Sequence, residues 1–235
     1  MKFTPALTKG TLIKRYKRFL ADVELSDGEV ITIHCPNTGS MKNCNEPGSS
    51  VWFSDSGNPK RKYRHTWEIV SVGGAGQFLA GINTGLANKL VKQAIEEGVI
   101  AELQEYDSLR TEVKYGQENS RIDLLLEKGP QQCFVEVKNV TLKEGEIAFF
   151  PDAVTERGRK HLRELAAMVE AGHRAVLVFC VQLTGVTQVR PADHIDAGYG
   201  ETLRKVVGLG VEVLAYQADI TPEKITLTNR LPVRL

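Results

Sequence analysis

The sequence predicts an α/β protein in which a small N-terminal β-barrel precedes a three-layer α/β domain. The first 83 residues hold short strand-like runs punctuated by Gly and Pro, without a helical pattern of any length. From residue 84 onward, helical periodicity alternates with short apolar runs, as in a sheet covered by helices. We therefore expect two domains, residues 1–83 and residues 84–235.

The barrel prediction depends on alternating strands separated by turn signals. Residues 26–28 (Ser-Asp-Gly) form one such signal, and residues 36–50 are rich in turn formers. Short strands with this punctuation suit a small closed barrel such as the OB-fold. The strand candidates are residues 11–25, 29–35, 51–55, 65–72 and 77–82.

The pattern of residues 84–235 predicts a helix, three strands, a helix, a strand, a helix and a strand. Apolar side chains recur at three- to four-residue spacing through the first helix, which Asn83 or Thr84 can cap. Residues 175–183 are continuously apolar, as expected of a buried central strand. The helix candidates are residues 83–105, 155–171 and 199–207. The strand candidates are residues 111–115, 122–127, 133–138, 175–183 and 211–218, with 141–151 as a connection.

Composition argues against membrane and disulfide-rich classes. Of the 235 residues, 42% are hydrophobic and 25% charged, which is ordinary for a globular domain. No apolar run could cross a membrane and no secretory signal is evident, so we expect a cytoplasmic protein. Cys133 and Cys180 lie in apolar strands. Cys35 and Cys44 suggest a zinc site, but their spacing does not fit the common ribbons.

The net charge of +1 hides an asymmetry. Residues 1–83 hold 11 Lys/Arg against 7 Asp/Glu, whereas residues 84–235 hold 19 against 22. The basic part contains two clusters in which cations alternate with aromatic rings, which could neutralise phosphates and stack on bases. A solvated strand edge is the alternative. The predicted nucleic-acid contacts are Lys14, Arg15, Tyr16, Lys17 and Arg18 in one cluster, and Lys60, Arg61, Lys62, Tyr63 and Arg64 in the other.

Charged side chains interrupt two apolar strands within residues 120–139. Glu136 and Lys138 are two apart on one strand and share a face, while Asp123 lies on the preceding strand. Buried charges are costly unless they are paired or hold a metal. Two carboxylates and a lysine can bind a hard divalent cation beside a phosphate. A wet strand face with an ordinary salt bridge is the alternative.

The order helix, Asp123, Glu136-x-Lys138, helix resembles the core of the PD-(D/E)xK nuclease superfamily. The segments SRIDLLL, FVEVKNVTL and FPDAVTERGRKHLREL, with HCPNTGSM and KRYKRFLADV upstream, resemble the sugar fermentation stimulation protein A (SfsA) family across essentially the whole chain. The resemblance implies an OB-like domain before a restriction-endonuclease-like domain. It also implies DNA binding without strong sequence preference, and a role in regulating sugar (maltose) metabolism.

Residue by residue, the resemblance makes Asp123 and Glu136 ligands of Mg²⁺ or Mn²⁺ and Lys138 the phosphate-side lysine. Related nucleases often add an acid from the first helix, where this chain has Asn88 or apolar residues. Glu112 on the first strand is the nearest substitute. On the second helix, the predicted phosphate contacts Arg157 and His161 are four apart and share a face. They could equally be ordinary surface residues of an amphipathic helix.

Three functions are therefore open. The first is a DNA-binding protein with a nuclease-like fold, and the second is an active metal-dependent DNA phosphodiesterase, which is compatible with the first. The third is a module that binds RNA or another polyanion.

Overall fold

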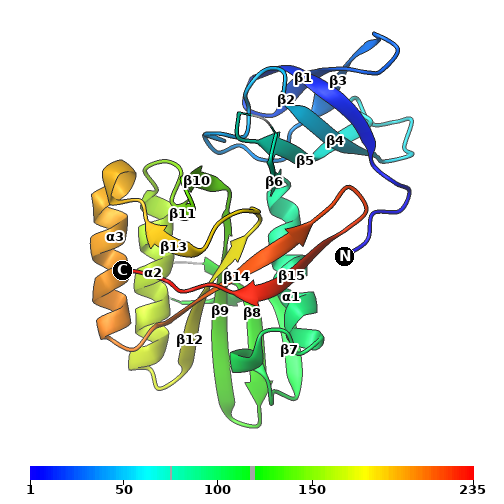
Figure 1. The fold of residues 1–235 in the computed structure, drawn as a ribbon. Coiled ribbons are helices and arrows are strands. Elements are labelled where there is room, and N and C mark those ends of the chain that lie inside the picture. The colour runs from blue at the N-terminus through cyan, green and yellow to red at the C-terminus, as the bar shows by residue number, and fades with distance from the viewer. Residues whose placement is uncertain (75, 117–119) are drawn as a thin grey trace.

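The N-terminal third of the chain is a closed barrel. The computed structural model describes residues 1–74, 76–116 and 120–235, and Figure 1 shows the barrel above the second domain. Its strands run in the order β3-β2-β1-β4-β5-β6, and β3 also pairs with β5, which closes the barrel and confirms the OB-like prediction. The strands are β1 (Thr8–Tyr16), β2 (Leu20–Glu24), β3 (Val30–His34), β4 (Ser50–Asp55), β5 (His65–Val72) and β6 (Phe78–Gly81).

The prediction of one long strand over residues 11–25 was wrong, because the chain turns back within it. β1 and β2 form an antiparallel hairpin in which Tyr16 faces Leu20. The turn places Lys17 and Arg18 at φ values of 49° and 64°. This left-handed conformation is usually taken by Gly, Asn or Asp. The sequence therefore carries no turn signal here.

The second domain is a mixed sheet between helical layers. Its strands run in the order β15-β14-β12-β9-β8-β7. Figure 1 shows α2 and α3 side by side on one face of the sheet and α1 on the other. This arrangement confirms the three-layer α/β prediction. The helical elements are η1 (Thr84–Leu86), α1 (Ala87–Glu96), η2 (Ala101–Leu103), α2 (Glu156–Glu170) and α3 (Asp193–Gly208). The sheet strands are β7 (Ser108–Tyr115), β8 (Ser120–Lys128), β9 (Gln131–Val140), β12 (Arg174–Val181), β14 (Glu212–Ile220) and β15 (Ile225–Arg230).

Several short elements escaped the sequence pattern. The expected connection at 141–151 contains β10 (Leu142–Glu144) and β11 (Ile147–Phe150), and β11 pairs in parallel with β13 (Gln188–Pro191). The first helix ends at Glu96, since Gly98 has a φ of 75°. The third helix begins at Asp193, six residues earlier than predicted. Strands of three or four residues are too short for periodicity to reveal.

Two apolar layers hold the second domain together, one on each face of the sheet. Phe134 and Leu125 belong to the core on the side of α2 and α3, while Val135 and Leu124 belong to the core beneath α1. The alternation along β8 and β9 thus sends neighbouring side chains to opposite layers. Glu136 and Lys138 continue the face of Phe134.

The barrel is fastened to the second domain at several points. Ser40 Oγ donates to Asp152 Oδ2 at 2.9 Å, and the Met41 N–H donates to the same carboxylate oxygen. Main-chain bonds join Leu79 in β6 to Thr184, and the Phe3 N–H donates to the Glu223 carbonyl beside β15. The N-terminal segment therefore runs from the barrel to the side of β15, the edge strand of the C-terminal sheet, as Figure 1 shows.

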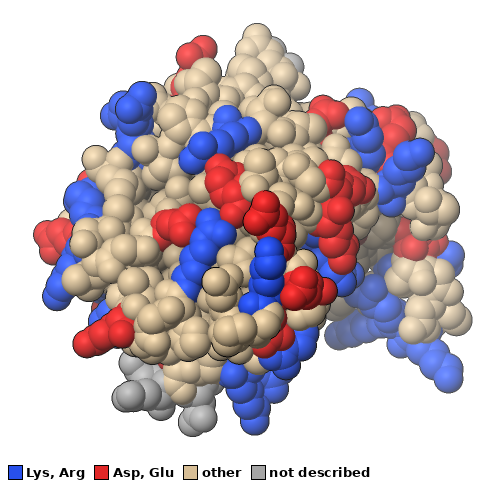
Figure 2. All heavy atoms as spheres, turned by 90° about the horizontal axis from the view of Figure 1, so that it is seen from below, with Lys and Arg blue, Asp and Glu red and all other residues tan. Residues whose placement is uncertain are grey.

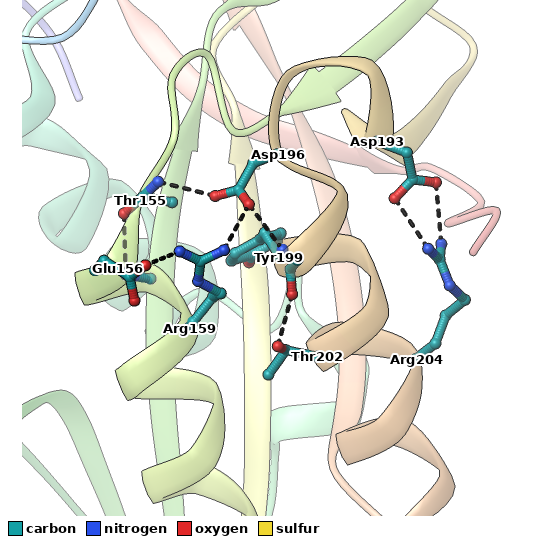
Figure 3. A network of polar contacts seen from close by, with 10 residues as sticks. Thr155, Glu156, Arg159, Asp193, Asp196, Tyr199, Thr202 and Arg204 are labelled. Carbon is teal, nitrogen blue, oxygen red and sulfur yellow. Dashed lines mark hydrogen bonds and ion pairs between the residues drawn. The ribbon is translucent and has the colours of Figure 1, made fainter.

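A buried carboxylate fixes how α2 meets α3 (Figure 3). Asp196 is 4% exposed and accepts from the Thr155 N–H at 2.8 Å, from Arg159 Nη1 at 3.0 Å and from the Tyr199 N–H at 3.0 Å. Asp196 itself has non-helical φ and ψ angles, so α3 is kinked there. These bonds set the position of the N-terminus of α2, which carries Arg157 and His161.

Replacing Asp196 with Ala should lower the free energy of unfolding by about 3 kcal/mol, because it strands a partly buried arginine and two N–H donors. Urea denaturation at pH 7 measures the change. The matched control is Asp193→Ala on the same helix, whose carboxylate pairs with Arg204 in a half-exposed bridge and should cost less than about 1 kcal/mol. Equal losses in the two variants would contradict this account.

Candidate functional site

The site lies where β8 and β9 separate. Their antiparallel ladder runs from Lys128–Gln131 to Leu124–Val135 and ends there. At the next position the Val137 N–H donates to the side chain of Asp123, with 2.7 Å between nitrogen and Oδ2. β9 meanwhile continues in parallel register with β12. We call this point of separation the fork. Asp123 on β8 and Glu136 on β9 lie opposite each other there, at the position that follows the last paired residues, Leu124 and Val135.

Asp123 is held from two sides. Its Oδ1 accepts a hydrogen bond from Asn88 Nδ2 of α1 at 2.8 Å, while Oδ2 takes the main-chain bond from Val137. Burial and then the negative charge of Glu136 raise the pKa of Asp123 to about 6, although the two hydrogen bonds favour the ionised form. A cation bound next to Asp123 would offset the repulsion between the negative charges of Asp123 and Glu136.

Glu136 is almost fully buried, at 2% exposure. Its Oε1 accepts from Lys138 Nζ at 2.6 Å and contacts His161 Nδ1. Burial opposes its ionisation, but the hydrogen bond from His161 and the charge of Lys138 outweigh burial and hold the pKa of Glu136 below its ordinary value. Among the described residues, Glu136 Oε2 is buried without a hydrogen-bond partner.

His161 links the carboxylate to the surface of α2. Arg157 Nε lies 3.3 Å from His161 Nε2, and because a guanidinium only donates, we assign Nε2 as the acceptor. The ring proton then sits on Nδ1 and points to Glu136. Both ring nitrogens of His161 are thus engaged with protein groups and the ring is 8% exposed, whereas Arg157 lies exposed at the start of the helix.

These residues surround a cavity of about 670 Å³. Glu112 enters it from β7, where it is exposed and has a φ of 55°. Arg121 shares the β8 face of Asp123 and is exposed. The full lining is Glu112, Ser120, Arg121, Asp123, Glu136, Val137, Lys138, Phe150, Thr155, Arg157, Gly158, Lys160 and His161. The cavity therefore combines acids that can hold a cation with bases that can contact a phosphate.

The donor set fits a hard divalent cation with few protein ligands. Within residues 1–74, 76–116 and 120–235, no group of three or more His, Cys, Asp or Glu could hold a metal ion. Two opposed carboxylates remain, one with a buried and unpaired oxygen at Glu136. Mg²⁺ and Mn²⁺ accept such sites, completing their shells with water and phosphate oxygens. Asp123 and Glu136 are the residues that would hold the ion.

The cysteines considered for zinc are buried core residues. Cys35 Sγ lies 3.4 Å from Met41 Sδ, and Cys44 Sγ lies 3.5 Å from the Thr141 carbonyl oxygen. Burial raises the pKa of the Cys44 thiol to about 12, which disfavours the thiolate that zinc requires.

Most side chains of the first basic cluster make contacts within the protein. Arg15 Nη2 donates to the carbonyls of Asn37 and Gly39, and Arg18 donates to the Thr38 carbonyl. The two arginines hold the loop whose next residues dock onto Asp152. Tyr16 Oη and Lys14 Nζ both approach the carboxylate of Asp22. Lys17 is the remaining member of the predicted set, and it lies exposed at the β1–β2 turn.

The second basic cluster forms the β4–β5 loop. Lys60, Arg61 and Lys62 are exposed, and Lys62 Nζ lies 5.6 Å from the ring centroid of Tyr63. Arg64 instead pairs with Asp55 at 2.5 Å. In OB-folds the loops between the first and second and between the fourth and fifth strands border the oligonucleotide-binding face. Lys17 and Arg18 of the first cluster and all of the second cluster fall on these loops.

The face of the molecule seen from below carries charges of both signs. Figure 2 shows the molecule from below, where basic and acidic side chains are interspersed. Among the described residues, this face therefore shows no single-sign patch of the kind that attracts a polyanion.

Two residues with long-range contacts, one at the site and one beneath the barrel loop, escaped the sequence argument. Asn88 was noted only as a departure from an acidic pattern, and its bond to Asp123 depends on how α1 crosses the sheet. Asp152 was quoted only within a family motif, although it receives the barrel loop through Ser40 and Met41. Neither residue carries a local signal, because each acts through a partner that is distant in the chain.

Fold and site together define a two-domain protein, an OB-like barrel joined to a sheet that carries an Asp…Glu-x-Lys fork. Residues 13–80 match the SfsA N-terminal OB domain and residues 85–224 match the sugar fermentation stimulation protein RE domain. The chain belongs to the sugar fermentation stimulation protein (SfsA) family.

Relatives match along the whole chain. A sugar fermentation stimulation protein homolog of Geobacter metallireducens is 60% identical, with 100% of both chains covered. A homolog from Shewanella sp. strain MR-4 is 57% identical, again with 100% of both chains covered. A solved structure of Pyrococcus furiosus SfsA in complex with Ca²⁺ superposes with a TM-score of 0.88 at 28% identity, covering 100% of this chain and 98% of the other. No helix among the described residues is long and apolar enough to span a membrane.

The raised pKa of Asp123 makes stability depend on pH in a defined direction. The folded protein holds this proton more tightly than the unfolded chain, whose value is near 3.8, so stability falls as pH rises from about 4 to about 6. The difference in unfolding free energy between wild type and Asp123→Asn should fall by about 2 kcal/mol between pH 4 and pH 7, measured in EDTA.

Asp219→Asn provides the control for this titration, since that carboxylate is half-exposed and paired with Lys224. Its difference from wild type should change by less than about 1 kcal/mol over the same interval. A flat difference for the Asp123 variant would mean that the buried carboxyl ionises normally.

Proposed function

We propose that this protein binds DNA without strong sequence preference and carries a divalent-cation site in its nuclease-like domain. The observation that carries the proposal is the fork at which Asp123 and Glu136 oppose each other, with one Glu136 oxygen buried and unpaired. The P. furiosus relative in complex with Ca²⁺ supports a cation in this fold. Mg²⁺ or Mn²⁺ is the ion we expect in this chain.

The barrel supplies the DNA contact in this proposal. Lys17 on one loop and Lys60, Arg61 and Lys62 on another would neutralise backbone phosphates, which gives affinity without reading sequence. Tyr63 beside Lys62 adds a ring on which an exposed base can stack. The relatives' name refers to sugar fermentation, and we propose DNA binding as the route by which the chain regulates sugar (maltose) metabolism.

A second candidate function, hydrolysis of a DNA phosphodiester, is favoured by the placement of Lys138. Its ammonium lies 2.6 Å from Glu136 and lines the same cavity as Arg121 and Arg157. A bound Mg²⁺ or Mn²⁺ would supply Lewis acidity and a water of lowered pKa. Lys138 would orient the attacking water or offset developing charge, the two arginines would hold the phosphate, and His161 would keep Glu136 in position.

Replacing Lys60, Arg61 and Lys62 together with Ala should weaken binding to all DNA sequences alike, by roughly tenfold or more, and reduce the salt slope by about three. Fluorescence anisotropy over a salt series measures both quantities. The matched control replaces Arg163, Lys205 and Arg234, which are exposed in the second domain. Equal losses in the two triple variants would contradict a barrel-centred contact, and RNA competing better than DNA of equal length would favour the RNA-binding alternative.

Asp123→Ala should abolish cation binding at the fork and any hydrolysis that depends on it. Calorimetry with Mn²⁺ measures the first, and plasmid and single-stranded DNA incubated with Mg²⁺ or Mn²⁺ measure the second. Cleavage by wild type but not by the variant would establish the enzyme. Mn²⁺ binding without cleavage would leave a DNA-binding protein with a cation site, and the same Mn²⁺ binding in both proteins would place the ion elsewhere.

A further inference from the structure

The least expected partner of the site is an amide. Asn88 lies on α1, which covers the face of the sheet opposite α2, yet its side chain reaches Asp123 at the fork. It can do so because the β8–β9 ladder has ended one residue earlier and leaves Asp123 accessible from both layers. The fork is therefore bounded by α1 on one side and by α2, through His161, on the other.

In this contact Asn88 is the hydrogen-bond donor and Asp123 is the acceptor. A carboxylate only accepts hydrogen bonds, so the Asn88 amide presents its nitrogen to Asp123 Oδ1, at 2.8 Å. With the Val137 N–H on Oδ2, each oxygen of Asp123 already has one donor when no cation is bound. A third carboxylate at position 88 would instead face Asp123 as a like charge at hydrogen-bonding distance.

The affinity of an oxygen-ligand site for a divalent cation rises with the negative charge of its ligands. The fork supplies two carboxylates, and Lys138 and His161 already contact one oxygen of Glu136. An amide in place of a third acid therefore lowers cation affinity and removes the repulsion that an unoccupied three-acid site would suffer. The remaining ligand positions fall to water or to phosphate oxygens of a substrate.

We propose that Asn88 determines the cation affinity of this site, keeping the fork stable without an ion and making cation binding weak. This inference rests on the proposed cation site at Asp123 and Glu136. Asn88 acts through Asp123 as a positioning residue, and its replacement by Asp converts the fork into a three-carboxylate site that needs the ion for stability.

Asn88→Asp should bind Ca²⁺ roughly tenfold more tightly than wild type in calorimetry at neutral pH. In EDTA it should melt at a lower temperature than wild type, and it should gain more thermal stability from added Ca²⁺. The control is Gln93→Glu, which adds the same charge to the same helix where the amide contacts Glu97 rather than the fork. Asn88→Ala removes the donor without adding charge, so it should not show the tighter Ca²⁺ binding expected of Asn88→Asp.

The outcomes separate this inference from the site on which it rests. If Asn88→Asp binds Ca²⁺ no more tightly than wild type or Gln93→Glu, while Asp123→Ala loses binding, then Asn88 does not set the affinity and the site stands. If neither wild type nor Asn88→Asp shows Ca²⁺ binding in calorimetry, with heat of either sign, the cation site itself is wrong. Tighter binding together with a lower melting temperature in EDTA, confined to Asn88→Asp, supports the proposal.

Discussion

The bond between the Val137 N–H and the carboxylate of Asp123 is the interaction around which the second domain is arranged. It takes the place of a main-chain ladder bond at the point where β8 leaves β9. A sheet that separates in its middle would ordinarily leave buried donors unpaired, at a cost of about 1–3 kcal/mol each. Here an acidic side chain accepts the bond, so the same residue stabilises the fork and faces the cavity that the fork opens.

The surroundings of the two carboxylates at the fork shift their pKa values in opposite directions. Burial and a neighbouring charge raise the pKa of Asp123, whereas His161 and Lys138 hold the pKa of Glu136 below its usual value. Groups whose surroundings push their pKa values apart are typical of functional sites. The contrast arises because His161 and Lys138 both contact Glu136 Oε1, while Asp123 is hydrogen-bonded to neutral donors.

Contacts also connect the barrel to this region. Arg15 and Arg18 hold the loop after β3, and Ser40 and Met41 of that loop bind Asp152 shortly before α2 begins. α2 in turn is positioned by Asp196, and it carries Arg157 and His161. Arginines that were expected to bind nucleic acid thus maintain the arrangement of the two domains, whereas Lys17, Lys60 and Lys62 on the barrel loops stay exposed.

The sequence by itself determined the fold class, the order of the longer elements and the identity of the charged trio. The spacing of apolar residues predicts which face of an element is buried, and a charge within an apolar strand marks an unusual position. Both signals can be read from the sequence because they involve residues close together in the chain. Glu136 and Lys138 share a face simply because they are two residues apart on a strand. The family followed from motifs of the same local kind.

Only the tertiary structure decided which groups meet across the fold. Asn88 on Asp123, His161 on Glu136 and Asp152 beneath the barrel loop each join segments at least 25 residues apart. The hairpin at Lys17 and Arg18 was hidden because its turn contains no turn-forming residue such as Gly, Asn or Asp. Contacts of this kind depend on helix crossing and on where a ladder ends, and long-range packing sets both.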